Sequence, residues 1–172
     1  MKCLGYPDDH PVLANQLREM ENLMIYDGDK LYLQPCVSPV WDTAWAIIAL
    51  HESGMPGADS SLQKAGQWLL SKEVRHYGDW ALKCKVDEPS GWYFQYANEF
   101  YPDTDDSAAV LMALQRVSLP ERMHKEKAVL RGLQWLLAMQ CDDGGWGAFD
   151  RNNNKAILNH IPFADFNALL DS

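Results

Sequence analysis

Three aspartates within four residues are the most chemically informative feature of the sequence. Asp103, Asp105 and Asp106 form the segment Asp-Thr-Asp-Asp, which follows the aromatic stretch 91–96 and precedes an apolar helical run from Ser107 to Val117. Carboxylates this close repel one another, so at least one of them is expected to keep its proton near neutral pH. A carboxylic acid beside aromatic and apolar side chains can protonate an apolar substrate. The segment therefore indicates acid-initiated carbocation chemistry rather than hydrolysis.

Helix capping is the simpler interpretation of the same residues. Asp106 lies where a helix N-cap is expected, and Asp103 begins what is typical of a turn. An earlier, similar stretch of the chain has Asp42 at the place of Asp106 but lacks the paired acids. We therefore expect N-caps at both Asp42 and Asp106, which leaves Asp103 and Asp105 for chemistry.

Composition and charge exclude several classes of function. The chain has 172 residues, 47% of them hydrophobic, which is typical of a globular protein. Its net charge is -9 and its lysines and arginines do not cluster, so nucleic acid is not an expected partner. The four cysteines are widely spaced and form no Cys-x-x-Cys pair, which favours free thiols in a reducing cytosol.

Membrane spans, metals and cofactors are not expected either. The longest apolar stretch, 44–50, is far shorter than the roughly 20 residues of a spanning helix, and the N-terminus lacks an apolar signal core. The segment 142–154 is rich in Asp and Asn, but its spacing does not fit an EF-hand and no Glu closes it. A solvated loop is therefore expected there.

An internal repeat predicts the architecture. Residues 42–50 are similar to residues 106–114, at an offset of 106 − 42 = 64, and residues 64–70 are similar to 130–136 at offsets of 66 to 67. Gly78-Asp79-Trp80 aligns with Gly144-Gly145-Trp146, since 144 − 78 = 66. One unit is therefore an inner helix, a short Pro-containing loop, an outer helix and a Gly-x-Trp turn.

The repeat and the apolar periodicity together predict an all-α fold. Helices are expected over Pro11–Met24, from Asp42, from Asp59, over 107–117 and over about 121–140, whereas strand signals are weak. Helical hairpins of this kind bury their faces against neighbouring copies, and about three copies are needed for stability. Because only two full copies are present, we expect part of a larger toroid of helical hairpins, a partial α/α barrel.

Several segments resemble the squalene–hopene cyclases of the terpene cyclase family. The similarity covers essentially the whole chain. The segments that carry it are the QW-repeat-like Arg131-Gly132-Leu133-Gln134-Trp135-Leu136 and Gln140-Cys141-Asp142-Asp143-Gly144-Gly145-Trp146, the DxDD-like Asp103-Thr104-Asp105-Asp106, and the stretches 34–43 and 159–163. The DxDD acid motif distinguishes this likeness from the oxidosqualene cyclases, which have a different acid motif. The resemblance implies an enzyme with two α/α barrels around an apolar cavity. Residues 1–36 would be the tail of the first barrel, and residues 37–172 the N-terminal half of the second, catalytic barrel.

The resemblance also implies roles for individual residues. Asp105 would donate the proton, with Asp103 and Asp106 holding and orienting it. The other residues implied are the cation-stabilising aromatics Trp41, Phe94 and Phe149, the cavity-wall residue Gln95, and the substrate entrance Phe163, Ala164 and Phe166. Aromatic residues at helix starts are also common in hydrophobic cores, and Gln95 fits a solvent-facing turn equally well. The family often has Cys at the place of Ala164.

The function implied is cyclisation of squalene to hopene or hopanol without a metal or cofactor. The parent enzyme would be cytoplasmic, would lie monotopically on the inner membrane through parts outside this chain, and would form a homodimer. A class II diterpene cyclase, which shares the acid motif, and an inactive α/α repeat scaffold are the alternatives. Because a downstream Asp/His pair of the family lies outside the 172 residues, the chain alone is expected to be inactive.

Overall fold

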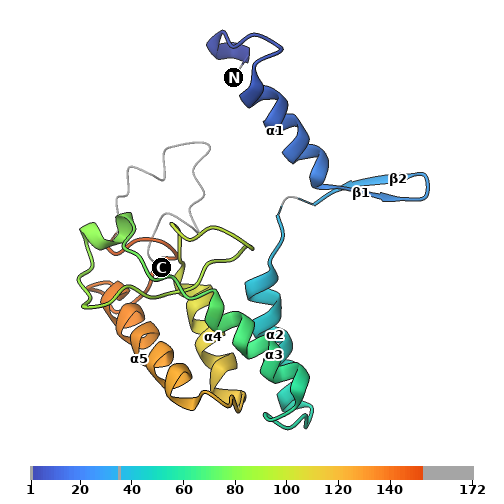
Figure 1. Ribbon diagram of the computed structural model, residues 1–172. Helices are drawn as coiled ribbons and strands as arrows, with labels where there is room; N and C mark the ends of the chain where they lie inside the picture. Colours follow the sequence, from blue (N-terminus) through green and yellow to red (C-terminus); the bar gives the residue numbers. More distant parts are fainter. Residues whose placement is uncertain (1, 35, 153–172) are drawn as a thin grey trace. The chain divides into compact units, whose positions relative to one another are not determined.

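The chain divides into two compact units. The computed structural model (Figure 1) describes residues 2–34 and 36–152. The units are Met1–Val37 and Ser38–Ser172. This boundary lies one residue from the one expected between residues 36 and 37, and each unit is described by itself below.

The first unit consists of a helix and a β-hairpin. It contains the short 3₁₀ helix η1 (Lys2–Leu4) and the helix α1 (Pro11–Asn22), which begins at a proline as is common at the first helical position. Strands β1 (Met24–Asp27) and β2 (Lys30–Leu33) pair antiparallel, with Asp27 opposite Lys30. The predicted helix from Pro11 is confirmed but ends at Asn22, two residues before Met24, and the weak strand signals did not indicate the two strands that follow. Gly28, with φ of 63°, allows the two-residue turn that joins β1 to β2.

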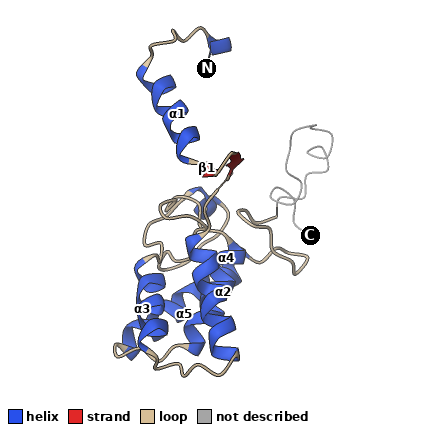
Figure 2. Cartoon of the chain, turned by 90° about the vertical axis from the view of Figure 1, so that its right-hand side faces the viewer, coloured by secondary structure: helices blue, strands red, loops and turns tan. Residues whose placement is uncertain are grey.

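The second unit is built from two helical hairpins. The first contains α2 (Pro39–Glu52) and α3 (Ser60–Ser71), and the second contains α4 (Thr104–Arg116) and α5 (Arg122–Met139). A 3₁₀ helix, η2 (Asp79–Leu82), lies in the long segment between the hairpins. Figures 1 and 2 show the short α2–α3 and α4–α5 connections at one end of the four helices and the long loops at the other. The described residues hold five α-helices and one small sheet, so the all-α prediction is confirmed.

The two inner helices, α2 and α4, pack against each other and carry much of the core. Helix α3 packs on α2, and α5 packs on α4. The buried core side chains of these helices include Val40, Ile47, Leu62, Leu69, Val110, Leu111 and Leu114. Gly132 lets α5 approach closely, because a Cβ atom there would lie 2.9 Å from the Trp92 ring and 3.0 Å from Leu111.

The outer helix α5 is closed by the turn expected from the QW-like motif. The Trp146 indole Nε1 donates to the carbonyl oxygen of Leu136 at 2.8 Å, and the Gln140 amide donates to the carbonyl oxygen of Gly144 at 2.8 Å. Gly144 has φ of 95°, a backbone conformation that favours glycine. The Trp146 bond satisfies a carbonyl group that the end of α5 leaves without a partner, and the Gln140 bond closes the turn that follows.

In the first copy, the corresponding turn is made by Gly91-Trp92 rather than by Gly78-Asp79-Trp80. Trp92 Nε1 donates to Leu69 O at 2.7 Å, as Trp146 does to Leu136 O. The backbone bond Val74 N to Gly91 O, at 2.9 Å, likewise matches Cys141 N to Gly145 O at 2.9 Å. The acceptor carbonyls are offset by 136 − 69 = 67 residues, but the tryptophans only by 146 − 92 = 54. The expected alignment of Trp80 was therefore wrong, because the first copy has 67 − 54 = 13 additional residues before its tryptophan.

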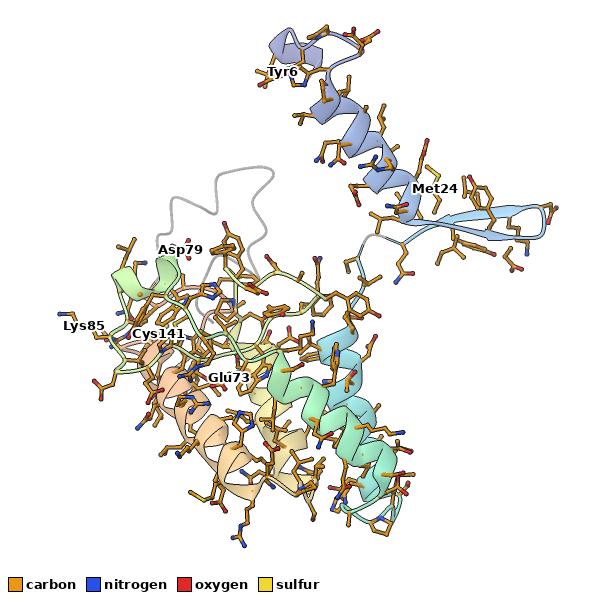
Figure 3. All side chains as sticks on the ribbon, viewed as in Figure 1. Tyr6, Met24, Glu73, Asp79, Lys85 and Cys141 are labelled. Carbon is orange, nitrogen blue, oxygen red and sulfur yellow. The ribbon has the colours of Figure 1, made fainter. Side chains whose placement is uncertain are left out.

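A buried ion pair ties the additional residues to α5. Glu73, which Figure 3 labels, lies just after α3. Its carboxylate accepts two hydrogen bonds from the Arg131 guanidinium, at 2.9 and 2.7 Å, in a bidentate pair. Ser90 Oγ donates to the same carboxylate at 2.8 Å. The segment from Glu73 to Ser90 therefore begins and ends at the same ion pair. Gly91 and Trp92 continue from there towards α4.

Trp92 and Trp146 provide a matched pair for measuring how much this turn stabilises the fold. Trp92→Phe should lower the free energy of unfolding by at least about 2 kcal/mol, because it removes a buried donor and leaves a void. Trp146→Phe removes the same bond at a side chain that is 40% exposed, and should cost less than about 1 kcal/mol because water replaces the donor. Urea unfolding of both variants measures the difference. An equal loss of unfolding free energy in the two variants would contradict the expectation that the buried Trp92 stabilises the fold more than Trp146 does.

Candidate active site

The acid segment forms the first turn of α4. Asp103 is the N-cap, with extended backbone angles (φ −121°, ψ 161°), and its Oδ1 accepts a hydrogen bond from the backbone N–H of Asp106 at 2.7 Å. The prediction that Asp106 is the cap was therefore wrong by three residues. Capping by an aspartate at this position satisfies one of the donors that the start of a helix leaves without a partner.

The expected N-cap at Asp42 was also wrong. Helix α2 begins with Pro39 after the N-cap residue Ser38, and Asp42 lies within its first turn. The Asp42 carboxylate accepts from the Ser38 hydroxyl at 2.8 Å and caps no backbone group. Proline at the first helical position, which supplies no N–H, shifts the start of α2 towards the N-terminus.

Trp92 holds the backbone of the acid segment in place. Asp103 N donates to Trp92 O at 2.9 Å in an isolated antiparallel bridge, and Trp92 N donates to Ser107 Oγ at 2.8 Å. Trp92 and Ser107 are both fully buried. The same tryptophan therefore closes the α3 turn and fixes the start of α4, which links the acid segment to the first hairpin.

Two of the three carboxyl groups are buried and the third is exposed. Asp103 and Asp106 retain only 5% and 2% of their accessible surface, whereas Asp105 is exposed. Burial, followed by the hydrogen bond with the Asp106 side chain and the charge of that side chain, raises the pKa of Asp103 to about 9. The backbone N–H of Asp106 acts in the opposite direction but is outweighed. Asp103 therefore holds a proton at neutral pH, as the sequence predicted for one member of the cluster.

The pKa of the second buried carboxyl group, Asp106, shifts in the same direction. Burial also raises the pKa of Asp106, although its side-chain hydrogen bond with Asp103 lowers it. Burial therefore favours the protonated form of both carboxyl groups, and the assignment of the donated proton to Asp105 stays a prediction. Asp106 Oδ1 is buried and has no hydrogen-bond partner within the described part of the chain. This arrangement disfavours a charge on both members of the pair.

The acid segment opens on a pocket of about 440 Å³, within the size range of small-molecule sites. The start of α2, the loop before α4, the first turn of α4 and the loop after α5 all contribute to it. The lining residues are Trp41, Phe94, Gln95, Asn98, Tyr101, Asp103, Asp105, Asp106, Ala148 and Phe149. The pocket thus brings together all the predicted site residues that the structure describes.

Three predicted site residues are not described by the structure, and three residues of the pocket were not predicted. Phe163, Ala164 and Phe166 lie outside the described residues. Asn98, Tyr101 and Ala148 line the pocket but were not predicted. Tyr101 lies two residues before Asp103, so its proximity to the acids was available from the sequence. Asn98 and Ala148 reach the pocket only through the path of their loops.

The aromatic side chains are held by different means. Trp41 packs edge-on against Trp45, with ring centroids 5.6 Å apart. Phe94 is partly buried, and its carbonyl oxygen accepts from Val40 N at 3.4 Å. Phe149 is 43% exposed at the rim of the pocket. Each ring lies in a lining where its π face can attract a positive charge.

The described residues contain neither a grouping of metal ligands nor a membrane-spanning helix. No three His, Cys, Asp or Glu side chains within the described ranges are grouped so that they could hold a metal ion. None of the helices in the described part of the chain has the length and apolarity that a membrane crossing needs.

Two helical hairpins thus bring an acid cluster and aromatic rings into one pocket. The family model for the squalene–hopene cyclase C-terminal domain matches residues 37–172. The chain belongs to the squalene–hopene cyclase family, as its sequence motifs predicted.

Individual relatives are similar along nearly the whole chain. The squalene–hopene cyclase of Zymomonas mobilis is 45% identical over 98% of this chain, and that of Schizosaccharomyces japonicus is 44% identical over 99% of it. The dammaradiene synthase of Dryopteris crassirhizoma is 43% identical over 99% of this chain. The alignments cover 27%, 27% and 25% of these relatives, so the chain spans about a quarter of their length.

The raised pKa of Asp103 predicts a pH-dependent stability. The folded state binds a proton at Asp103 up to about pH 9, whereas the unfolded chain releases it near the ordinary value of 3.8. The folded state therefore binds more protons between these values, and stability should fall as the pH rises through this window. Asp103→Asn, which keeps a neutral side chain with a capping oxygen, should flatten this slope. Unfolding midpoints in urea at pH 5, 7 and 9 measure it.

Asp103→Ala separates the cap from the proton. It should flatten the slope as well, but it also removes the cap and so lowers stability by about 1 kcal/mol at every pH. If Asp103→Asn unfolds with the same pH dependence as the unsubstituted protein, the proton is not held at Asp103.

Proposed function

We propose that this chain carries the acid of an enzyme that cyclises squalene to hopene or hopanol. The observation on which the proposal depends is the single pocket where a buried, proton-holding aspartate pair, an exposed third carboxyl group and aromatic rings meet. Membership of the squalene–hopene cyclase family supports the same reaction class.

In the proposed first step, Asp105 protonates a terminal double bond of squalene. The O–H bond of the carboxyl group breaks, a C–H bond forms with the π electrons of the alkene, and a tertiary cation remains. Successive double bonds then attack the cation and close the rings. Loss of a proton gives hopene, and capture of water followed by loss of a proton gives hopanol. The proton lost at the end balances the one donated at the start.

Asp105 is the proposed donor because its carboxyl group is the exposed member of the cluster at the pocket. Asp103 and Asp106 would serve it by keeping a proton in the cluster at neutral pH. The negative charge of Asp105 is itself one of the causes that raise the pKa of Asp103, so the two groups interact. A proton can therefore be exchanged within the cluster before it reaches the substrate.

The aromatic rings would stabilise the cations that follow. Trp41, Phe94 and Phe149 come from three different segments around the pocket, so their rings can stabilise a cation from more than one side. Each contact contributes about 0.5–2 kcal/mol, depending on how well water is excluded. Gln95 lines the same wall and would hydrogen-bond within it.

The location of the enzyme follows from the substrate. Squalene is a hydrocarbon that concentrates in membranes, so we propose a cytoplasmic enzyme bound to the surface of the inner membrane through parts outside residues 1–172. A homodimer is proposed for the same full-length enzyme.

The donor assignment is tested by substituting the acids one at a time in the full-length polypeptide that contains this chain. Asp105→Asn should reduce squalene turnover by at least about 10²-fold, because it removes the group that protonates the alkene. Asp103→Asn should leave more activity, because Asp105, the proposed donor, is unchanged. Gas chromatography of hopene and hopanol measures both. Near-normal product from Asp105→Asn, with loss in Asp103→Asn, would make Asp103 the donor.

The substrate class is tested by supplying squalene and geranylgeranyl diphosphate in parallel. The proposal expects polycyclic products from squalene only. Cyclisation of the diphosphate would instead indicate a class II diterpene cyclase. No turnover of either, by a folded full-length protein, would leave an inactive repeat scaffold.

A further inference from the structure

Thr104, the residue between the acids, joins the start of α4 to the loop that carries Phe149. Its backbone N–H donates to Ala148 O at 2.9 Å, and its hydroxyl Oγ1 donates to Gly147 O at 3.0 Å. Thr104 is buried, with 4% of its surface accessible. Water therefore cannot readily replace either bond if it breaks.

The backbone bond follows from the position of Thr104 in the helix. As the first helical residue after the N-cap, its N–H has no acceptor within the helix. Asp103 caps the N–H of Asp106 instead, so the N–H of Thr104 needs a partner from elsewhere. Ala148 supplies it, and the loop is thereby attached directly to the acid-bearing turn.

Comparison with the first repeat shows that the hydrogen bond of the Thr104 hydroxyl is specific to the second repeat. Val40 occupies the place of Thr104, since 104 − 40 = 64, and it is fully buried. Its N–H donates to Phe94 O at 3.4 Å, the counterpart of Ala148 O, since 148 − 94 = 54. Both repeats therefore use a backbone bond to hold a loop at the pocket. Only the second repeat adds a side-chain bond, so packing alone does not require the hydroxyl.

Phe149 is the side chain that this second bond can control. It follows Ala148 directly, lines the pocket with Asp105 and is 43% exposed. On its other side, the loop is held by the ion pair of Lys83 with Asp150, at 2.9 Å, between partly exposed side chains. Such a pair contributes little, so the buried bonds of Thr104 are the firmer attachment.

We propose that Thr104 is a positioning residue that fixes the ring of Phe149 relative to the acid, and so controls how far cyclisation proceeds. This inference rests on the proposed function. A loosened ring stabilises later cations less well, so the reaction ends early and releases partly cyclised products. Protonation itself is unaffected, because Asp105 is unchanged.

The test compares Thr104→Val with Thr104→Ser in the full-length polypeptide. Valine keeps the shape and the backbone N–H but lacks the hydroxyl, whereas serine keeps the hydroxyl. Hydrogen exchange of the residue 104 amide and of segment 141–152 reports the attachment without any need for activity. Thr104→Val should accelerate this exchange about fivefold, the effect of losing one hydrogen bond, and Thr104→Ser should restore slow exchange.

Product analysis with squalene gives the second measurement. Thr104→Val should raise the share of partly cyclised products in the same direction as Phe149→Leu, while squalene consumption falls less than twofold. Unchanged exchange and products in Thr104→Val, or equal effects of the serine and valine variants, would overturn the inference. If the valine variant does not fold, Thr104→Ala takes its place against serine. If the unsubstituted protein does not cyclise squalene, the proposed function is refuted. The attachment of the loop by Thr104 is still supported in that case if Thr104→Val exchanges faster than Thr104→Ser.

Discussion

A helix leaves its first backbone N–H groups without acceptors inside the helix, and at α4 most of these groups are buried. Their partners are therefore taken from the surroundings of the pocket. The Asp103 carboxyl accepts from Asp106 N, and Ala148 O accepts from Thr104 N. The same turn also binds Trp92, which donates its backbone N–H to Ser107 Oγ. The requirement to satisfy one helix end thus assembles the acid, both loops and the aromatic lining.

The electrostatics of this helix end result from two opposing effects. The positive end of the helix dipole and the bonded N–H group favour an ionised carboxylate. Burial favours the neutral acid, and the neighbouring carboxyl group adds to it. At Asp103 burial outweighs the helix end, and the pKa rises to about 9. Asp59 makes the same kind of cap at the start of α3, at 2.8 Å, without a second carboxyl group beside it. The raised pKa of Asp103 therefore results from the burial of this cap and from the carboxyl group beside it.

Sequence patterns predicted the helices, the repeat and the pocket residues better than the local details. Apolar periodicity located α2 to α5, and the carboxyl groups and aromatic residues named from the DxDD likeness line one pocket in the structure. The N-cap was misplaced because Asp103 and Asp106 both have the composition of a cap, and only the backbone path decides between them. The hairpin of β1 and β2 was missed, although Gly28-Asp29 between two apolar stretches is a turn signal. The counterpart of Trp146 in the first repeat is Trp92 rather than the expected Trp80, because the first repeat has 13 additional residues before this tryptophan. Similar spacing could not reveal this, whereas the shared hydrogen bond to the outer helix does.

The two repeats explain how one scaffold supplies both an acid and an aromatic wall. Trp41 and Asp105 are equivalent positions, since 105 − 41 = 64, and both line the same pocket from the first turns of neighbouring inner helices. The backbone arrangement behind them is also shared, because Val40 and Thr104 each hold a following loop through an N–H group. The difference in chemistry therefore comes from side chains at matched places on a common backbone. One inner helix presents a π face and the other a carboxyl group. Because both helix starts are fixed by buried hydrogen bonds, the distance between acid and ring is set by the packing of α2 against α4 rather than by either loop.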